Sequence, residues 1–435
     1  MATATPTVAG GVVYAGSWDE HFYAVNLHTG KLEWERHLSP QHGITPYPGH
    51  PDRGTDGGLV TSSAWFEPGA GGRDGRPDLV IFGGGYTLYA LDAHTGRMFW
   101  TREYTGRPEQ PAQPDTDQTR IFSSPVVVGD KVIFGVDVDG QSDHRGYIVA
   151  ASLATGAPIW KYETDVDAAG HVLNDGCGSV WSSGTVLPSL GLVVFGTADC
   201  HGSNPPPTSE SVLALRIADG TFAWAFRPSR PDALCDKDVG ATANAGVTPS
   251  GNVNFLGVGS KDGTYYSIDP TTGAQRWSTN VVFGGFSGGF IGTAAYDGRA
   301  VYGATAIGDF GRFQGATLNS IKCEPSNPRD TPMQEPSMHA FDATTGGVLW
   351  QQTQAASFGS TTVAGGMTFN GLALNGDYVQ VRDAATGALL SQLQFPSACW
   401  SGIATVGDAL VFGTGSSFQS QNAGIVAVTP GGKAP

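Results

Sequence analysis

The stretch of residues 175–200, "DGCGSVWSSGTVLPSLGLVVFGTADC", concentrates residue types that can do chemistry. It reads as two extended runs on either side of a Pro/Gly turn, with a tryptophan on one arm and an aspartate on the other. If the runs pair antiparallel about that turn, Cys177 faces Cys200. Cross-strand cysteines at that separation can form a disulfide without moving the backbone. The spacing therefore predicts a Cys177–Cys200 bridge that fastens the hairpin presenting Trp181 and Asp199.

Other residues that could take part in chemistry lie in less distinctive sequence segments. Asp236 and Asp238 alternate along a strand-like stretch, and Lys261 precedes an Asp-Gly turn dipeptide, so solvated positions would also suit them. "GFSGG" at residues 285–289 matches a nucleophile-elbow pattern, but that motif needs a strand-to-helix turn, which we do not expect here. The ten histidines show no spacing typical of metal ligands.

A repeated phrase indicates which elements position these residues. Each copy is a strand, a turn with glycine where a positive φ is wanted, and a second strand that ends in an indole. A seventh copy, "VQVRDAATGALLSQL", lacks the indole. The six complete copies are "YAVNLHTGKLEW" ending at Trp34, "YALDAHTGRMFW" at Trp100, "VAASLATGAPIW" at Trp160, "LALRIADGTFAW" at Trp224, "YSIDPTTGAQRW" at Trp277 and "HAFDATTGGVLW" at Trp350.

A second style of hairpin lies upstream of each phrase, as in "TVAGGVVYAGS" and "SSPVVVGDKVIFGV", and eight such hairpins can be found. Each pair of hairpins makes one four-stranded antiparallel sheet that cannot bury both faces by itself, and stacking around an axis solves that problem. We expect an all-β, eight-bladed β-propeller that forms one domain over residues 1–435. Two long loops, at about 101–120 and 308–337, are of a length that is usually functional or disordered.

Composition narrows the partners and the compartment. A formal net charge of -15 argues against nucleic acid or an anionic membrane as a partner, because both require a basic face. No apolar run is long enough to span a bilayer. Five cysteines favour an exported protein, so we expect a secreted or periplasmic location, with a signal peptide removed and replaced by Met1.

The phrase Ala-x-Asp-x-x-Thr-Gly-x-x-x-Trp resembles the tryptophan-docking motif of propellers of the pyrroloquinoline quinone (PQQ) type. The resemblance covers nearly the whole chain and implies the eight-bladed fold, although propellers without a cofactor share this motif. The segment "VWSSGTVLPSLGLVVFGTADC" is similar to the part of PQQ alcohol dehydrogenases that stacks on the quinone and binds calcium. By this resemblance Trp181 is the stacking floor and Asp199 is a calcium ligand, an oxygen donor of the kind that calcium prefers.

Further segments extend the resemblance. "CDKDVGATANAG" is similar to the segment that supplies the catalytic aspartate, which implies Asp238 as the base with Asp236 beside it. "VGSKDGTYYSIDPTTG" resembles the stretch whose cation contacts the quinone carbonyls, and this role would fall to Lys261. Arg53, in "HPDRGTDGG", stands where an arginine binds a cofactor carboxylate in many members.

Departures from the family pattern also matter. The chain has neither a Cys-Cys pair to roof the quinone nor a Cys-x-x-Cys-His haem motif. The glutamate ligand of blade three has no clear counterpart, and Asp139, Gln141 and Asp143 are the candidates near its place. The chain looks most like the polyvinyl-alcohol dehydrogenase branch without its cytochrome domain.

The resemblance implies a PQQ- and calcium-dependent dehydrogenase that oxidises small-molecule alcohols, such as secondary ones, or polymeric alcohols. It would transfer a hydride to the quinone and pass the electrons to a separate acceptor. Two alternatives stay open at this point. One is a cofactor-free propeller that serves as a binding scaffold, as in the outer-membrane assembly lipoprotein. The other is a propeller enzyme that has lost PQQ and uses its central pocket for different chemistry.

Overall fold

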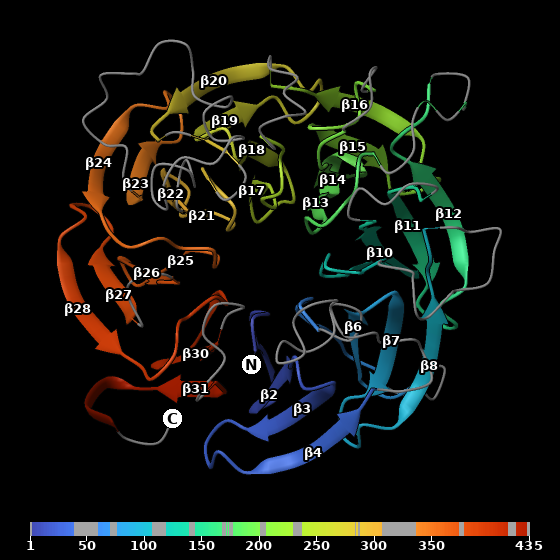
Figure 1. Ribbon diagram of the computed structural model, residues 1–435, viewed down its shortest axis with the longest axis horizontal. Coiled ribbons are helices and arrows are strands. Elements are labelled where there is room, and N and C mark those ends of the chain that lie inside the picture. Colours follow the sequence, from blue (N-terminus) through green and yellow to red (C-terminus); the bar gives the residue numbers. More distant parts are fainter. Residues whose placement is uncertain are drawn as a thin grey trace, which may run out of the picture.

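Eight antiparallel sheets are arranged as a ring around a central axis (Figure 1). The computed structural model describes residues 2–38, 60–69, 76–106, 119–138, 144–167, 171, 173, 177–200, 206–228, 237–282, 284–285, 288–306, 336–373, 378–415 and 423–432. Within the part described, helical structure is confined to two 3₁₀ turns, Pro188–Leu190 and Pro430–Gly432. Among these residues no helix is both long and apolar enough to cross a membrane. The predicted eight-bladed, all-β propeller is confirmed.

The strands follow one another around the ring in sequence order. Blade 1 holds β1 (Thr7–Ala9), β2 (Val12–Gly16), β3 (His21–Asn26) and β4 (Leu32–His37), and blade 2 holds β5 (Trp65–Glu67), β6 (Leu79–Gly84), β7 (Thr87–Asp92) and β8 (Met98–Glu103). Blade 3 holds β9 (Val126–Val128), β10 (Lys131–Val136), β11 (Tyr147–Ser152) and β12 (Pro158–Glu163), and blade 4 holds β13 (Thr185–Leu187), β14 (Leu192–Gly196), β15 (Val212–Arg216) and β16 (Phe222–Phe226).

The second half of the ring repeats this plan. Blade 5 holds β17 (Asn244–Val247), β18 (Val253–Gly259), β19 (Thr264–Ile268) and β20 (Gln275–Asn280), and blade 6 holds β21 (Ala295–Tyr296), β22 (Ala300–Ala304), β23 (Ser337–Asp342) and β24 (Val348–Thr353). Blade 7 holds β25 (Thr362–Ala364), β26 (Met367–Gly371), β27 (Tyr378–Asp383) and β28 (Leu389–Gln394), and blade 8 holds β29 (Ile403–Val406), β30 (Ala409–Gly413) and β31 (Ile425–Val428). Seven sheets therefore have the expected four strands, whereas the eighth has three within the described residues.

The two long loops have boundaries slightly different from those expected. Residues 101–103 belong to β8, and Ser337 begins β23. Most of both loops, residues 107–118 and 307–335, lies outside the described residues.

Each repeated indole fastens its blade to the next one. Its Nε1 donates to a backbone carbonyl in the Asp-x-x-Thr-Gly turn region of the following blade, as Trp160 does to the Ile217 oxygen at 3.0 Å. A Cβ added at Gly220, in that turn, would lie 2.5 Å from the Trp160 ring, so only glycine permits this contact. The other pairs of indole and acceptor carbonyl are Trp34 with Ala93, Trp100 with Leu153, Trp224 with Pro270, Trp277 with Ala343 and Trp350 with Ala384.

A second set of contacts joins the blades near the axis. Small hydroxyl residues just before the innermost strands accept hydrogen bonds from the backbone of the preceding connector. In each bond a backbone nitrogen donates to a side-chain hydroxyl oxygen. The pairs are Ser63 N with Ser124 Oγ at 2.9 Å, Ser124 N with Ser183 Oγ at 2.9 Å, Ser183 N with Thr242 Oγ1 at 3.0 Å, and Gly402 N with Thr5 Oγ1 at 3.1 Å. This inner belt of hydroxyl groups fixes the connectors that carry the candidate site.

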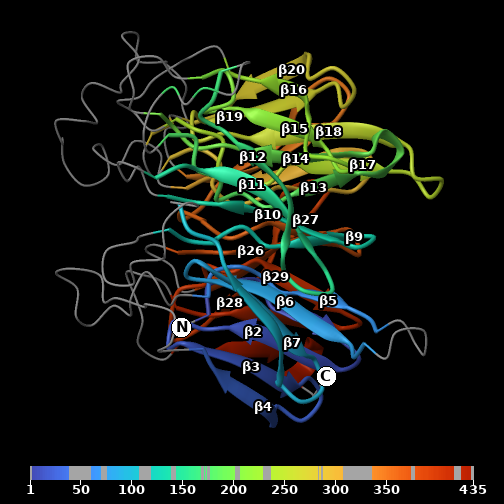
Figure 2. The same cartoon turned by 90° about the vertical axis from the view of Figure 1, so that its right-hand side faces the viewer.

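Antiparallel connectivity assigns the turns to two faces of the ring. The turns between the first and second strands and between the third and fourth strands of a blade lie on one face. The turns between the second and third strands, and the connectors between blades, lie on the other. Figure 2 views the ring edge-on, with the β17–β18 turn projecting on its right-hand side. We call that side the turn face and the opposite side the connector face.

Candidate functional site

Trp181 lies on the connector face, in the segment between β12 and β13. The Val180 nitrogen donates to the Val136 oxygen at 3.2 Å, and Ser182 Oγ accepts from the Gly196 nitrogen at 2.8 Å. These bonds fix the backbone on both sides of the indole, which is half-buried. Trp181 thus differs from the docking indoles, because it lies in the connector before an innermost strand and not within an outer strand.

The Trp181 indole rests against the next connector at Gly240. A Cβ built on Gly240 would lie 1.6 Å from the Trp181 Cζ2 atom, so any larger residue would displace the ring. Gly240 was not identified from the sequence. Gly240 precedes Ala-Thr just as Trp181 precedes Ser-Ser, so the sequence places the two residues at equivalent positions of successive connectors.

Asp238 and Lys261 form a buried ion pair beside this indole. Lys261 Nζ lies 3.5 Å from Asp238 Oδ1, and the two side chains are 7% and 2% exposed. The Lys261 backbone nitrogen donates to the Asp238 oxygen at 3.1 Å, and Ser260 Oγ donates to the same oxygen at 3.0 Å. Lys261 Nζ also lies 6.0 Å from the centre of the Trp181 ring. Three of the predicted site residues are therefore brought together.

The turn between β18 and β19 holds Lys261 through its neighbour Asp262. One Asp262 oxygen accepts from the Thr264 nitrogen at 2.8 Å, and the other accepts from the Tyr266 hydroxyl at 2.5 Å. Burial raises the pKa of the Asp262 carboxyl. The glycine-rich segment behind this turn packs closely, since a Cβ at Gly289 would lie 2.5 Å from the Ser260 oxygen. The described part of that segment leads into strand β21, so the nucleophile-elbow interpretation finds no strand-to-helix turn there.

The predicted Cys177–Cys200 disulfide is present, with 4.4 Å between the two Cα atoms. The Gly178 nitrogen donates to the Asp199 oxygen at 3.1 Å, and the Ala198 nitrogen donates to the Ser179 oxygen at 2.7 Å, so the hairpin continues past β13 and β14. Both cysteines are fully buried. The bridge fastens the hairpin that presents Trp181 and the half-buried Asp199, as expected.

The metal ligands are less completely defined. Asp139, Gln141, Asp143, Asp236 and Arg53 all lie outside the described residues. Within the described ranges, the one compact group of potential ligands joins Asp165 to Cys177 and Cys200, whose sulfur atoms are taken up by the disulfide. Asp199 therefore stays a predicted calcium ligand. Of the remaining cysteines, Cys399 is a buried thiol, and Cys235 and Cys323 fall outside the described residues.

Half-buried side chains occupy the position equivalent to that of Trp181 in three other connectors. Phe122, Ile291 and Trp400 each come just before a small residue of the connector. The Arg120 guanidinium lies 5.4 Å from the centre of the Phe122 ring, and the Phe358 and Trp400 rings are 5.2 Å apart. The sequence pattern that marks these positions is a large apolar residue followed by two small ones, in "FSS", "WSS", "IGT" and "WSG".

Comparison with known proteins agrees with the propeller fold. The chain is 26% identical over 380 residues to the polyvinylalcohol dehydrogenase of Sphingopyxis sp. (strain 113P3), an alignment that covers 79% of this chain and 52% of that relative. The chain thus spans about half the length of that relative. The crystal structure of quinohemoprotein alcohol dehydrogenase from Comamonas testosteroni covers all of this chain with a TM-score of 0.74 at 18% identity, over 75% of its own chain.

The fold match extends beyond proteins named as dehydrogenases. BamB from Moraxella catarrhalis matches 95% of this chain and 93% of its own with a TM-score of 0.61, at 16% identity. The family match is more specific, because residues 1–282 fit the model described as "PQQ: Glucose/ethanol/alcohol dehydrogenase, beta-propeller domain". The chain belongs to this family of PQQ dehydrogenase propellers.

Proposed function

We propose that this chain is a PQQ-dependent dehydrogenase that oxidises alcohols and passes the electrons to a separate acceptor outside the cytoplasm. The observation that carries the proposal is the buried Asp238–Lys261 pair beside the half-buried Trp181 ring, 6.0 Å from Lys261 Nζ. A binding scaffold has no need of a buried lysine and aspartate at this place.

The described residues fit a flat, negatively charged cofactor. PQQ carries three carboxylates and an electrophilic quinone carbonyl, so its pocket needs an apolar platform, a cation and a base. Trp181 packs against Gly240 and would serve as the platform. Lys261 is nearly fully buried, and its charge would be little screened by water there.

When bound, PQQ would supply the quinone carbon that accepts a hydride from the alcohol. Asp238 would hold the alcohol hydroxyl and accept its proton at a carboxylate oxygen. Lys261 would stabilise negative charge that develops beside it. Asp199, with an oxygen from Asp139 or Asp143, would hold a calcium ion, which would help to polarise the substrate.

A polymeric alcohol is the substrate class that we favour, with smaller alcohols as the alternative. The polyvinylalcohol dehydrogenase of Sphingopyxis supports this choice, since its alignment extends over 79% of the chain.

The test is a titration of the purified chain with PQQ, in calcium and in chelator, followed by tryptophan quenching and then by dye reduction with a panel of alcohols. We expect binding that depends on calcium, is abolished by Trp181→Ala, and is retained in a Trp65→Phe control on another blade. Asp238→Asn should keep binding and lose turnover by about 100-fold or more. No binding at tens of micromolar PQQ would favour a propeller that uses its centre for something else.

A further inference from the structure

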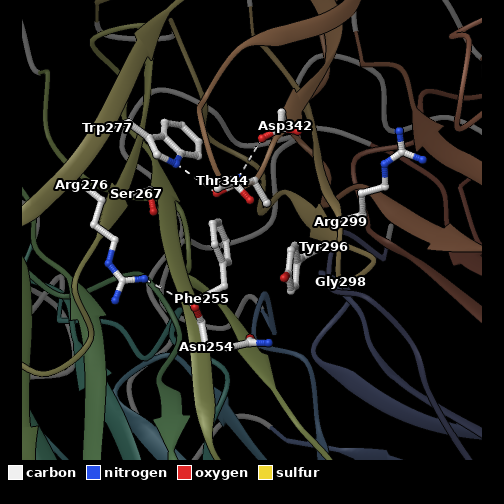
Figure 3. Close-up of a pocket in the computed structure, with 11 residues that line it drawn as sticks. Asn254, Phe255, Ser267, Arg276, Trp277, Tyr296, Gly298, Arg299, Asp342 and Thr344 are labelled. Carbon is white, nitrogen blue, oxygen red and sulfur yellow. Dashed lines mark hydrogen bonds between the residues drawn. The ribbon is translucent and has the colours of Figure 1, made fainter.

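A cavity of about 500 Å³ lies between blades 5 and 6, within the size range of small-molecule sites (Figure 3). Its floor contains two stacked rings, Phe255 and Tyr296, whose centres are 4.5 Å apart at an interplanar angle of 16°. Trp277 lies on another side of the cavity, and Arg276, Arg299 and Asp342 contribute polar groups.

The rings near Gly257 in blade 5 are arranged differently from those at the matching place in blade 1. In blade 1, the Tyr14 hydroxyl donates to the Ala93 oxygen, which also accepts from Trp34 Nε1. Tyr14 comes two residues before Gly16, the glycine that packs against the next connector, and Gly257 stands two residues before Gly259, its counterpart in blade 5. In blade 5 the Tyr265 ring lies beside the docking indole instead, with its centre 5.9 Å from that of Trp277. A Cβ built on Gly257 would lie 2.8 Å from Tyr265 Cε1 and 2.7 Å from Phe255 Cζ, so only glycine leaves room for these two rings.

The cavity opens on the turn face, away from the candidate active site. Gly298 and Arg299 belong to the β21–β22 turn, Asp342 is the last residue of β23, and Thr344 belongs to the β23–β24 turn. Lys261 lies in the β18–β19 turn, which falls on the connector face. The cavity is therefore a separate site from the one proposed for PQQ.

The charges around the cavity offset one another. Arg276 is paired with Asp269 at 3.0 Å, and its guanidinium also donates to the Asn254 oxygen at 3.4 Å. Arg299 interacts electrostatically with Asp342, and the Asp342 Oδ1 atom accepts from the Thr344 nitrogen at 3.0 Å. The carboxylates of Asp269 and Asp342 therefore disfavour binding of an anion. The guanidinium groups can donate hydrogen bonds and the carboxylates can accept them, which suits ligand hydroxyl groups, because a hydroxyl both donates and accepts.

We propose that this cavity binds a neutral polyhydroxylated ligand, either a segment of a polyol chain or a saccharide. Apolar C–H faces of the ligand would pack on Phe255, Tyr296 and Trp277, and its hydroxyls would bond the polar groups at the rim. If the ligand is the polymeric alcohol itself, a point that rests on the proposed function, the cavity anchors substrate away from the reacting end.

Affinity electrophoresis of the chain without PQQ and in chelator, in gels that contain polyvinyl alcohol or a dextran, tests the proposal. We expect retardation by at least one polymer, at least tenfold weaker in Tyr296→Ala and several-fold weaker in Arg299→Ala. Phe66→Ala is the matched control, because Phe66 packs on Tyr14 at the filled interface between blades 1 and 2, with ring centres 6.0 Å apart. This variant should behave as the unmodified chain.

Polyvinyl alcohol and dextran distinguish the two sources of the ligand. Lack of retardation by both polymers, retardation that survives Tyr296→Ala, or displacement of the polymer by sulfate at equal ionic strength would each overturn the proposal. Dye reduction by the PQQ-loaded chain is measured separately. If the proposed function is wrong, dye reduction is absent but the polymer still retards the chain. If the cavity proposal is wrong, retardation is absent but the loaded chain still oxidises small alcohols.

Discussion

At the scale of single residues, the candidate site depends on a buried charge pair that pattern matching did not reveal. Asp238 and Lys261 were assigned separate roles because they stand in different sequence segments, one in a connector and the other in a turn. The structure places their charged atoms 3.5 Å apart with almost no solvent exposure. Each therefore sets the electrostatic environment of the other.

This pair yields a prediction that does not require a cofactor. Lys261→Met would leave the Asp238 charge buried without its partner, and we expect it to lower the free energy of unfolding by about 3–5 kcal/mol. The double variant Asp238→Leu/Lys261→Met should regain a large part of that loss. Urea unfolding of both single variants and the double variant measures the coupling, and additive losses would contradict an energetically important pair.

Gly240 permits a sharper test of the platform. Gly240→Ala places a methyl group where the Trp181 ring lies, so the indole must move although it is still present. We expect weaker PQQ quenching, approaching that of Trp181→Ala. Gly424→Ala is the control, because a Cβ there meets nothing within 4 Å. Equal PQQ affinity in the two glycine variants would show that the position of the indole is unimportant.

At the scale of elements, much of the architecture could be predicted because its signals are local. The Thr-Gly turn, the indole four residues after its glycine and the cross-strand cysteines each follow from spacing within one hairpin. The inner belt of hydroxyl groups and the contact of Trp181 with Gly240 could not be predicted, because they join residues of neighbouring blades. Their geometry depends on how the sheets stack.

Two glycines of the repeated turns provide a matched pair for measuring how much the packing between blades contributes to stability. Gly30 and Gly220 occupy the same turn of blades 1 and 4 with φ values of 65° and 73°, but a Cβ at Gly30 meets nothing within 4 Å. Gly30→Ala should cost about 1–2 kcal/mol from backbone strain. Gly220→Ala carries the same strain and also displaces Trp160, which should add about 1–3 kcal/mol. Equal shifts of the urea midpoint would mean that docking adds little.

At the scale of the whole molecule, the ring is joined differently around blade 8. Ser391 takes the place of the docking indole in blade 7, opposite Val381. Residues at the beginning of the chain contact blade 8 instead, since the Ala2 nitrogen donates to the Thr414 oxygen at 3.2 Å and Gly402 donates to Thr5 Oγ1. The ring is thus closed by contacts between segments far apart in sequence, which no single repeat specifies.

A buried histidine links the stability of the whole ring to pH. His339 in β23 is fully buried, its Nε2 lies 3.1 Å from Ser337 Oγ, and its ring stacks on Phe341. Burial lowers the pKa of His339 from 6.5 to about 3. Between these two values the unfolded chain binds a proton that the folded chain does not. The contribution of neutral His339 to the free energy of unfolding should therefore be fully present above pH 6.5. As the pH drops below that value, the free energy of unfolding should fall by about 1.4 kcal/mol per pH unit.

The measurement is urea unfolding between pH 7 and pH 5, a range above the usual carboxylate titrations. His339→Gln keeps a side chain that can hydrogen-bond but does not titrate, so its stability should fall less steeply with decreasing pH, by about one proton per molecule. Its stability at pH 7 is compared first, which separates any packing defect from the pH dependence. Identical slopes for the two proteins would mean that His339 becomes protonated in the folded ring.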